Sequence, residues 1–154
     1  MISSNQYQDI EIQQNSDFQN VITFDAAHTI LTTMKYAAVI IKDYNHTAFT
    51  GPEKSNNQVG VAAADDNWQS GTVSKVHFDV VANRAAKTVT LTLPAEATQY
   101  FPDNFEGHWD LVEKDDQTND AWVKHIQGDV IISNGAVQLS FYFTPSISGI
   151  GGGG

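Results

Sequence analysis

Strict alternation of apolar and polar residues recurs along this chain and limits its fold more than any other feature. Leu91 and Leu93, for example, alternate with Thr90 and Thr92. Because successive side chains of a strand point to opposite faces of a sheet, this pattern predicts half-buried β-strands. Similar alternation occurs in residues 9–13, 18–24, 76–82, 88–93, 108–111, 122–132 and 137–143.

The remaining segments read as one central strand, turns and a single helical turn. Residues 35–42 lack alternation and suit a strand covered on both faces. Asn134-Gly135 is a strong hairpin signal, and residues 94–100 allow one helical turn after Pro94. Residues 44–70 read as a long polar excursion with one short strand around 59–63.

These segments predict an all-β fold in a single domain: an antiparallel, immunoglobulin-like β-sandwich with one short helical turn. The length of 154 residues suits one hydrophobic core. We expect that core to contain Phe78, Val80, Leu91, Leu93, Trp109, Leu111, Ile126, Val130 and Leu139.

Charge and cysteine content exclude several classes of function. The chain has 18 acidic and 8 basic residues, a net charge of -10, which argues against binding nucleic acid or an anionic membrane surface. It has no cysteine, which excludes a thiol nucleophile, disulfides, iron–sulfur ligation and thiolate zinc sites.

The five histidines form no close pair of the HxH or HExxH kind, so the sequence contains no zinc signature. His77, His108 and His125 occupy the polar phase of their strands, and we expect them to face solvent, although three imidazoles on neighbouring strands could share a metal. Residues 65–67 and 113–120 are rich in oxygen ligands but lack the pattern of an EF-hand loop, so we read them as turns and leave calcium open.

Nothing in the sequence nominates a catalytic pair or a nucleophile, so we expect no enzyme, no cofactor and no metal site; a glycosidase is the weakest of the alternatives. Trp109 and Trp122 lie in the apolar phase and are expected in the core. Trp68, beside Asp65-Asp66-Asn67, is the tryptophan that we expect to be exposed for ligand contact. Its exposure would favour the alternative of a carbohydrate-binding module for host-surface glycans.

One succession of motifs begins with the strand at residues 87–93 and continues through Pro94 and a one-turn helix to Trp109-Asp110-Leu111. It ends with the strand at 122–132, which contains Gly128. This succession resembles the N-terminal β-sandwich of bacteriophage baseplate upper proteins and related tail-fibre attachment domains. The resemblance covers about residues 8–133. Physically, Pro94 ends a strand, Trp109 and Leu111 re-enter the core, and Gly128 permits a bulge or close packing. The excursion at 44–70 and the strand at 137–143 depart from the family.

The resemblance implies a virion structural protein located in the phage tail. Its role would be that of an N-terminal anchoring module, which attaches a tail fibre or baseplate component to a tail, baseplate or adaptor protein. We assign residues 1–143 to the sandwich and 144–154 to a glycine-rich linker, and expect a longer fibre to follow it. Fibres of this kind imply a homotrimer, in which Ile147 and Ile150 of the exit segment would contact one another between chains.

Overall fold

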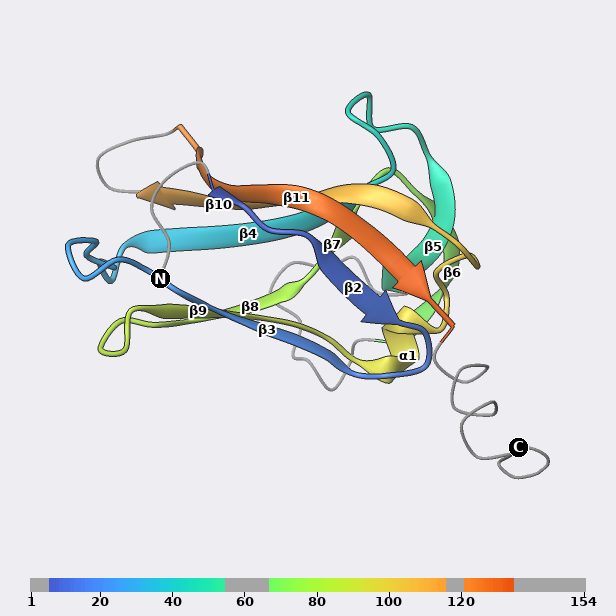
Figure 1. Ribbon diagram of the computed structural model, residues 1–154, viewed down its shortest axis with the longest axis horizontal. Helices are drawn as coiled ribbons and strands as arrows, with labels where there is room; N and C mark the ends of the chain where they lie inside the picture. The colour runs from blue at the N-terminus through green and yellow to red at the C-terminus, as the bar shows by residue number, and fades with distance from the viewer. Residues whose placement is uncertain (1–5, 55–66, 116–120, 135–154) are drawn as a thin grey trace, which may run out of the picture.

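The computed structural model describes residues 6–54, 67–115 and 121–134, and within these the chain is mostly β-strand (Figure 1). No helix among the described residues is long and apolar enough to cross a membrane. The elements are β1 (Gln6–Tyr7), β2 (Ile10–Gln13), β3 (Phe18–Thr23), β4 (Met34–Ile41), β5 (Phe49–Lys54), β6 (Trp68–Val73), β7 (Val76–His77), β8 (Asp79–Asn83), β9 (Thr88–Leu93), α1 (Ala95–Thr98), β10 (Glu106–Asp115) and β11 (Val123–Ser133).

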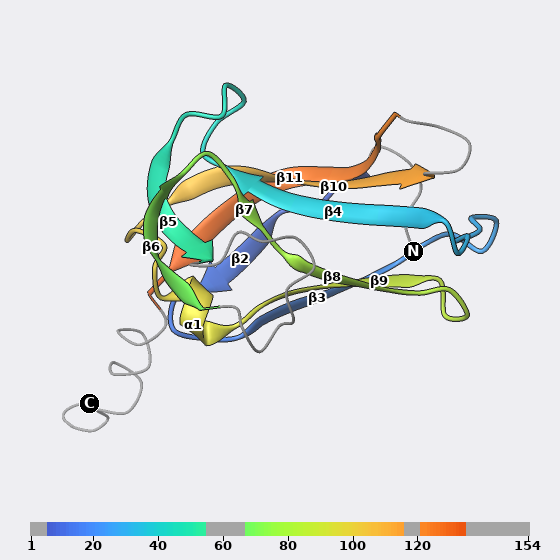
Figure 2. The same ribbon diagram turned by 180° about the vertical axis from the view of Figure 1, so that it is seen from behind.

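Two sheets face each other as the layers of a sandwich (Figures 1 and 2). The larger has the order β1-β11-β10-β4-β7, with β2 also paired to β11, and the smaller has the order β3-β9-β8. One continuous segment joins them, because β7 pairs with β4 while β8 pairs with β9. The predicted all-β sandwich is confirmed, as is the central position of the strand at 35–42, which lies in β4 between β10 and β7.

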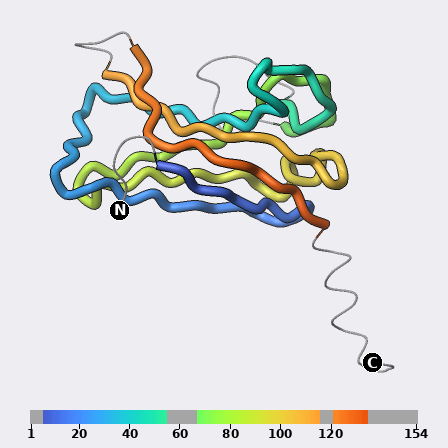
Figure 3. Tube along the Cα trace, turned by 45° about the horizontal axis from the view of Figure 1, so that its top comes forward, coloured from blue at the N-terminus to red at the C-terminus, as the bar shows by residue number. Residues whose placement is uncertain are grey.

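The strands of the sandwich pair antiparallel as predicted, except at the N-terminus. Both β1 and β2 run parallel to β11, while the other strand pairs are antiparallel. Figure 3 shows the N-terminal segment lying alongside the last described strand. These short strands complete the edge of the larger sheet beyond β11, and parallel pairing needs no tight hairpin between its partners.

The core lies between the two sheets, as the alternation predicted. Phe78, Leu91, Leu93, Trp109, Leu111, Ile126 and Val130 are all buried. Val80 is partly buried and packs against this core. Leu139 lies outside the described residues, as do the strands expected around 59–63 and 137–143, Gly135 of the expected hairpin and the residues 144–154 assigned to a linker.

The single helical turn predicted after Pro94 is confirmed as α1, at the end of the sandwich where the chain passes from β9 towards β10 (Figure 1). The backbone N–H of Ala95 donates a hydrogen bond of 2.8 Å to the Asp17 carboxylate, and the hydroxyl of Thr98 donates one of 2.9 Å to the Ser16 carbonyl. Residues of the β2–β3 turn therefore hold the helix in place.

The reading of residues 44–70 as an excursion with little structure is wrong. Its two ends form the antiparallel hairpin strands β5 and β6, with Phe49 opposite Val73 and Lys54 opposite Trp68. Phe49 is buried, and its ring lies 4.8 Å from that of Phe105, between ring centroids. This contact with distant residues explains why the local polar pattern did not reveal the strands.

Gly128 fills the close-packing role that the sequence predicted. A Cβ atom at this position would lie 1.9 Å from the carbonyl oxygen of Gln8. The same oxygen accepts a hydrogen bond of 2.7 Å from Nε1 of the fully buried Trp109. Glycine at 128 thus allows the N-terminal segment to approach β11 and to satisfy the buried indole N–H.

Gly128→Ala should therefore destabilise the protein by about 1–3 kcal/mol, because the new methyl group meets backbone that cannot rotate away. Gly71→Ala is the matched control, since there the added Cβ meets mainly the carboxylate of Glu53, which can move. Urea unfolding followed by tryptophan fluorescence measures both. Equal stability of the two variants would contradict this account of Gly128.

Candidate functional site

Glu113 is a charged residue placed inside the sandwich. It follows Trp109 and Leu111 at intervals of two along β10, so its side chain points inward, and it is only 7% exposed. Burying a carboxylate costs free energy unless hydrogen-bond donors surround it. The fold must therefore supply those donors, and three different parts of the chain do so.

A β-bulge turns His125 towards Glu113. Leu111 pairs with Ile126, but the next residue, Val112, pairs with Lys124, so that His125 is an extra residue in β11. Bulges redirect the side chain of the extra residue. His125 is 5% exposed and points inward beside Ile126, which overturns the expectation that it faces solvent.

His28 approaches from the connection between β3 and β4, which crosses from one sheet to the other at the end of the sandwich opposite α1 (Figure 1). The Asp25 carboxylate accepts a hydrogen bond of 3.0 Å from the N–H of Ala27, and the Asp25 carbonyl accepts one of 2.9 Å from the N–H of His28. This tight turn folds the imidazole of His28 back onto the ring of Phe24, with 4.4 Å between the centroids.

The carboxylate of Glu113 accepts three hydrogen bonds. Nε2 of His28 lies 2.8 Å from Oε2, and Nε2 of His125 lies 3.1 Å from Oε1. The hydroxyl of Tyr36, directly opposite Glu113 on β4, donates to Oε2 as well. An ionised carboxylate only accepts, so both rings donate from Nε2. We call these four residues, His28, Tyr36, Glu113 and His125, the Glu113 cluster.

Burial and hydrogen bonding together shift the pKa values of Glu113 and Tyr36 in opposite directions. Burial alone would raise the pKa of Glu113, but the hydrogen bonds from Tyr36, His125 and His28 outweigh it and hold that pKa below its ordinary value. Burial, followed by the hydrogen bond to Glu113 and the negative charge of its carboxylate, raises the pKa of Tyr36 well above its ordinary value. At neutral pH the cluster therefore contains an ionised carboxylate and a neutral phenol.

The cluster also brings metal-ligating atoms together. One ligand atom each from His28, Glu113 and His125 lie within 4.8 Å of one another. Imidazole nitrogens with a carboxylate oxygen suit transition metals, whereas calcium takes six to eight oxygen ligands. Of these three residues, only His125 was assigned to a strand face from the alternation pattern. The pattern placed its side chain on the solvent face, whereas the side chain points into the core.

The other sequence-predicted residues lie apart from this cluster. Trp68 is partly buried against the core, and Nζ of Lys54 lies 5.3 Å from the centroid of its ring. Trp122, expected in the core, is instead 47% exposed, because it precedes the start of β11.

His77 is exposed, and His108 pairs with Asp129 at 3.0 Å. Ile147, Ile150 and most of the acidic residues at 65–67 and 113–120 lie outside the described residues.

A second feature is the outward face of the smaller sheet. Val21 on β3 and Val81 on β8 both lie opposite Thr90 of the central strand β9, and they are 49% and 68% exposed. Asp79 is the one charged residue among the nine outward positions, and it pairs with Lys54 at 3.3 Å. We call these nine residues the small-sheet face: Gln19, Val21, Thr23, Asp79, Val81, Asn83, Thr88, Thr90 and Thr92. In a chain of net charge -10, this face carries little charge.

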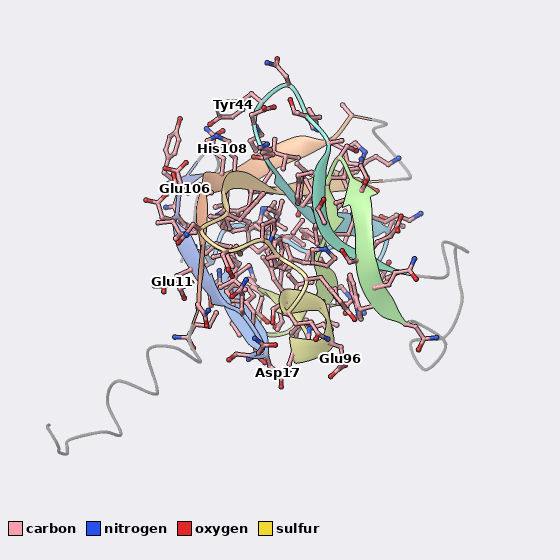
Figure 4. The ribbon with its side chains drawn as sticks, turned by 90° about the vertical axis from the view of Figure 1, so that its right-hand side faces the viewer. Glu11, Asp17, Tyr44, Glu96, Glu106 and His108 are labelled. Carbon is pink, nitrogen blue, oxygen red and sulfur yellow. The ribbon has the colours of Figure 1, made fainter. Side chains whose placement is uncertain are left out.

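A third feature is a shallow pocket of about 360 Å³ on the larger sheet, lined by Lys42, Glu106, His108, Asp129 and neighbouring residues. Figure 4 shows Tyr44 beside His108 and near Glu106. The two rings stack with 4.2 Å between centroids, and Tyr44 is 68% exposed. His108 lines the pocket and Tyr44 stacks on it, so an exposed aromatic ring lies beside charged side chains.

Comparison with known proteins identifies no family for this chain. No protein-family model matches it, and no curated protein is significantly similar to it.

Glu113→Gln should destabilise the metal-free protein by about 1–3 kcal/mol, because it replaces a charged acceptor of three hydrogen bonds with a neutral amide that has one accepting oxygen and leaves the buried His125 donor without its partner. Asp110→Asn is the matched control on the same strand: Asp110 pairs with Lys124 at 3.4 Å near the surface, and its loss should cost less than about 1 kcal/mol. Guanidinium unfolding in buffer containing a chelator measures both variants. A Glu113→Gln protein as stable as Asp110→Asn would show that the cluster does not stabilise the fold.

Proposed function

We propose that the chain is a bacteriophage virion structural protein, in which an immunoglobulin-like sandwich acts as the N-terminal anchoring module of a tail fibre or baseplate component. The observation that carries this proposal is the structural position of the motifs behind the resemblance. Pro94 ends β9 immediately before the single turn of α1, Trp109 and Leu111 are fully buried, and Gly128 packs against Gln8. These are the roles that the motif residues were expected to have.

The module would dock through the small-sheet face onto a tail, baseplate or adaptor protein. This face offers exposed valines, threonine hydroxyls and amides, with Asp79 already paired to Lys54. Removing an uncharged surface of this kind from water costs less free energy than removing a charged one. A homotrimer and a place in the phage tail belong to the same proposal and rest on the resemblance.

Val81→Glu tests this docking face in a phage that carries the gene. The new carboxylate would be buried without a partner at the interface, and incorporation of the protein into particles should fall at least about tenfold. Ile131→Glu is the control: Ile131 is also an exposed apolar strand residue, 52% accessible, but it lies on the outer face of the larger sheet.

Mass spectrometry of purified particles measures whether the wild-type protein is present and how much of each variant is incorporated. Wild-type protein that is absent from the particles would overturn the virion proposal itself. Wild-type protein present together with normal incorporation of Val81→Glu would overturn only the choice of docking face. Circular dichroism of the purified variants checks that each remains folded.

A carbohydrate-binding role is a second candidate, and the pocket beside Tyr44 is the observation that favours it. An exposed aromatic ring can stack on a sugar ring, and carboxylates beside it can accept hydrogen bonds from the sugar hydroxyls. Trp68, the residue expected to serve this role, has its ring partly covered by the core and approached by Lys54.

If glycans bind here, Tyr44→Ala should weaken binding to an array of bacterial surface polysaccharides by about tenfold or more, since the stacking surface is lost. Tyr7→Ala is the matched control, because Tyr7 is a similarly exposed tyrosine at 77% that lies on β1. Absence of binding by the wild-type protein, or equal binding by the Tyr44→Ala protein, would exclude this candidate.

A further inference from the structure

We propose that His28, Glu113 and His125 form a binding site for a single transition-metal ion, with Zn²⁺ as the best-suited ion. This inference is independent of the virion role. It rests on where the fold places two imidazoles and one carboxylate, which come from the β3–β4 connection, β10 and β11.

The distances between ligand atoms are close to those that zinc requires. Zinc binds histidine nitrogen and carboxylate oxygen at about 2.0–2.2 Å, so tetrahedral ligand atoms lie about 3.4 Å apart. The observed separations from the Glu113 oxygens are 2.8 Å for His28 and 3.1 Å for His125, and no two of the three ligand atoms are more than 4.8 Å apart. Closing the widest separation needs a movement of at most about 1.4 Å.

The two rings are already oriented for shared ligation. They meet edge to face with 5.2 Å between centroids, and each directs Nε2 at the same carboxylate. Phe24 supports both, since it stacks on His28 and lies 5.1 Å from His125, between centroids. On metal binding, the proton on each Nε2 would move to Nδ1, and the nitrogen lone pairs would face the ion.

Tyr36 would orient the carboxylate from outside the coordination shell. Its hydroxyl donates to Oε2 of Glu113, as second-shell groups commonly do for metal-bound carboxylates. The side chain of His28 is 23% exposed, whereas His125 and Glu113 are buried, so the ion would enter from the side of His28. Three protein ligands leave a fourth position for water, as in sites that perform chemistry.

The donor set also predicts selectivity. Two nitrogen ligands and one carboxylate favour Zn²⁺, Co²⁺, Ni²⁺ and Cu²⁺ over Mg²⁺ and Ca²⁺, which prefer oxygen ligands. Co²⁺ serves as a spectroscopic substitute, because its visible absorption reports nitrogen and oxygen ligands in a site of low coordination number.

The test is calorimetric titration of tag-free, metal-free protein with Zn²⁺, together with visible absorption during Co²⁺ titration. We expect one ion per chain, a rise in melting temperature with Zn²⁺, and no change with Mg²⁺ or Ca²⁺. His28→Ala should weaken Zn²⁺ binding at least about a hundredfold and abolish the cobalt absorption, since it removes one of three ligands. His28 lies on a partly exposed turn, so this variant should remain folded, which circular dichroism verifies.

His108→Ala and His77→Ala are the matched controls, because these histidines lie on the outward faces of strands away from the cluster. Both should bind Zn²⁺ as the wild-type protein does. If His28→Ala is unfolded, His28→Gln replaces it, since its side chain is polar and of similar reach. The proposal is overturned if wild-type protein binds no Zn²⁺, if the folded His28 variant binds it equally well, or if a control loses binding to the same extent.

Discussion

The pairing of β10 with β11 is the contact on which the rest of the structure depends. β10 carries β4 on its other edge, and β11 carries both N-terminal strands, so the larger sheet is assembled around this pair. Two local features of this pair, a glycine and a bulge, determine what lies inside. Gly128 admits the Gln8 carbonyl to the indole of Trp109, and the bulge after Leu111 turns His125 inward.

The bulge has a consequence for electrostatics. Without it, His125 would point to solvent and Glu113 would keep two of its three donors. With it, the carboxylate joins β10, β4, β11 and the β3–β4 connection through hydrogen bonds, and so holds that connection against the larger sheet at one end of the sandwich. A satisfied buried charge of this kind adds specificity to the packing, while a partly satisfied one would be costly. The same donors and acceptor are those that a transition metal would use.

Strands with a clear apolar–polar alternation could be predicted from the sequence. Features that depend on pairing with distant segments, such as the bulge at His125, could not. Leu91, Leu93 and Trp109 were placed in the core because phase alone decides their face. His125 was assigned to the wrong face, because alternation assumes an unbroken ladder and a bulge adds one residue to it.

The cluster itself could be predicted only in part. Glu113 was read as the first residue of an acidic turn, although its phase with Trp109 and Leu111 indicated an inward side chain. His28 lies in a turn without periodicity, so no local signal pointed to it. Strands β5 and β6 were missed for a related reason: their residues are polar and interrupted by glycine and proline, and the pairing becomes evident only with the buried contacts of Phe49.

The most direct test of this account is the protonation of the imidazole nitrogens, measured by long-range ¹H–¹⁵N NMR of the metal-free protein. Because Nε2 of both His28 and His125 donates to Glu113, the account predicts a proton on Nε2 of each ring, and protection of the His125 ring from solvent. An unprotonated Nε2 on His125, or a His125 ring as open to solvent as that of His77, would contradict the bulge, the cluster and the site built on them.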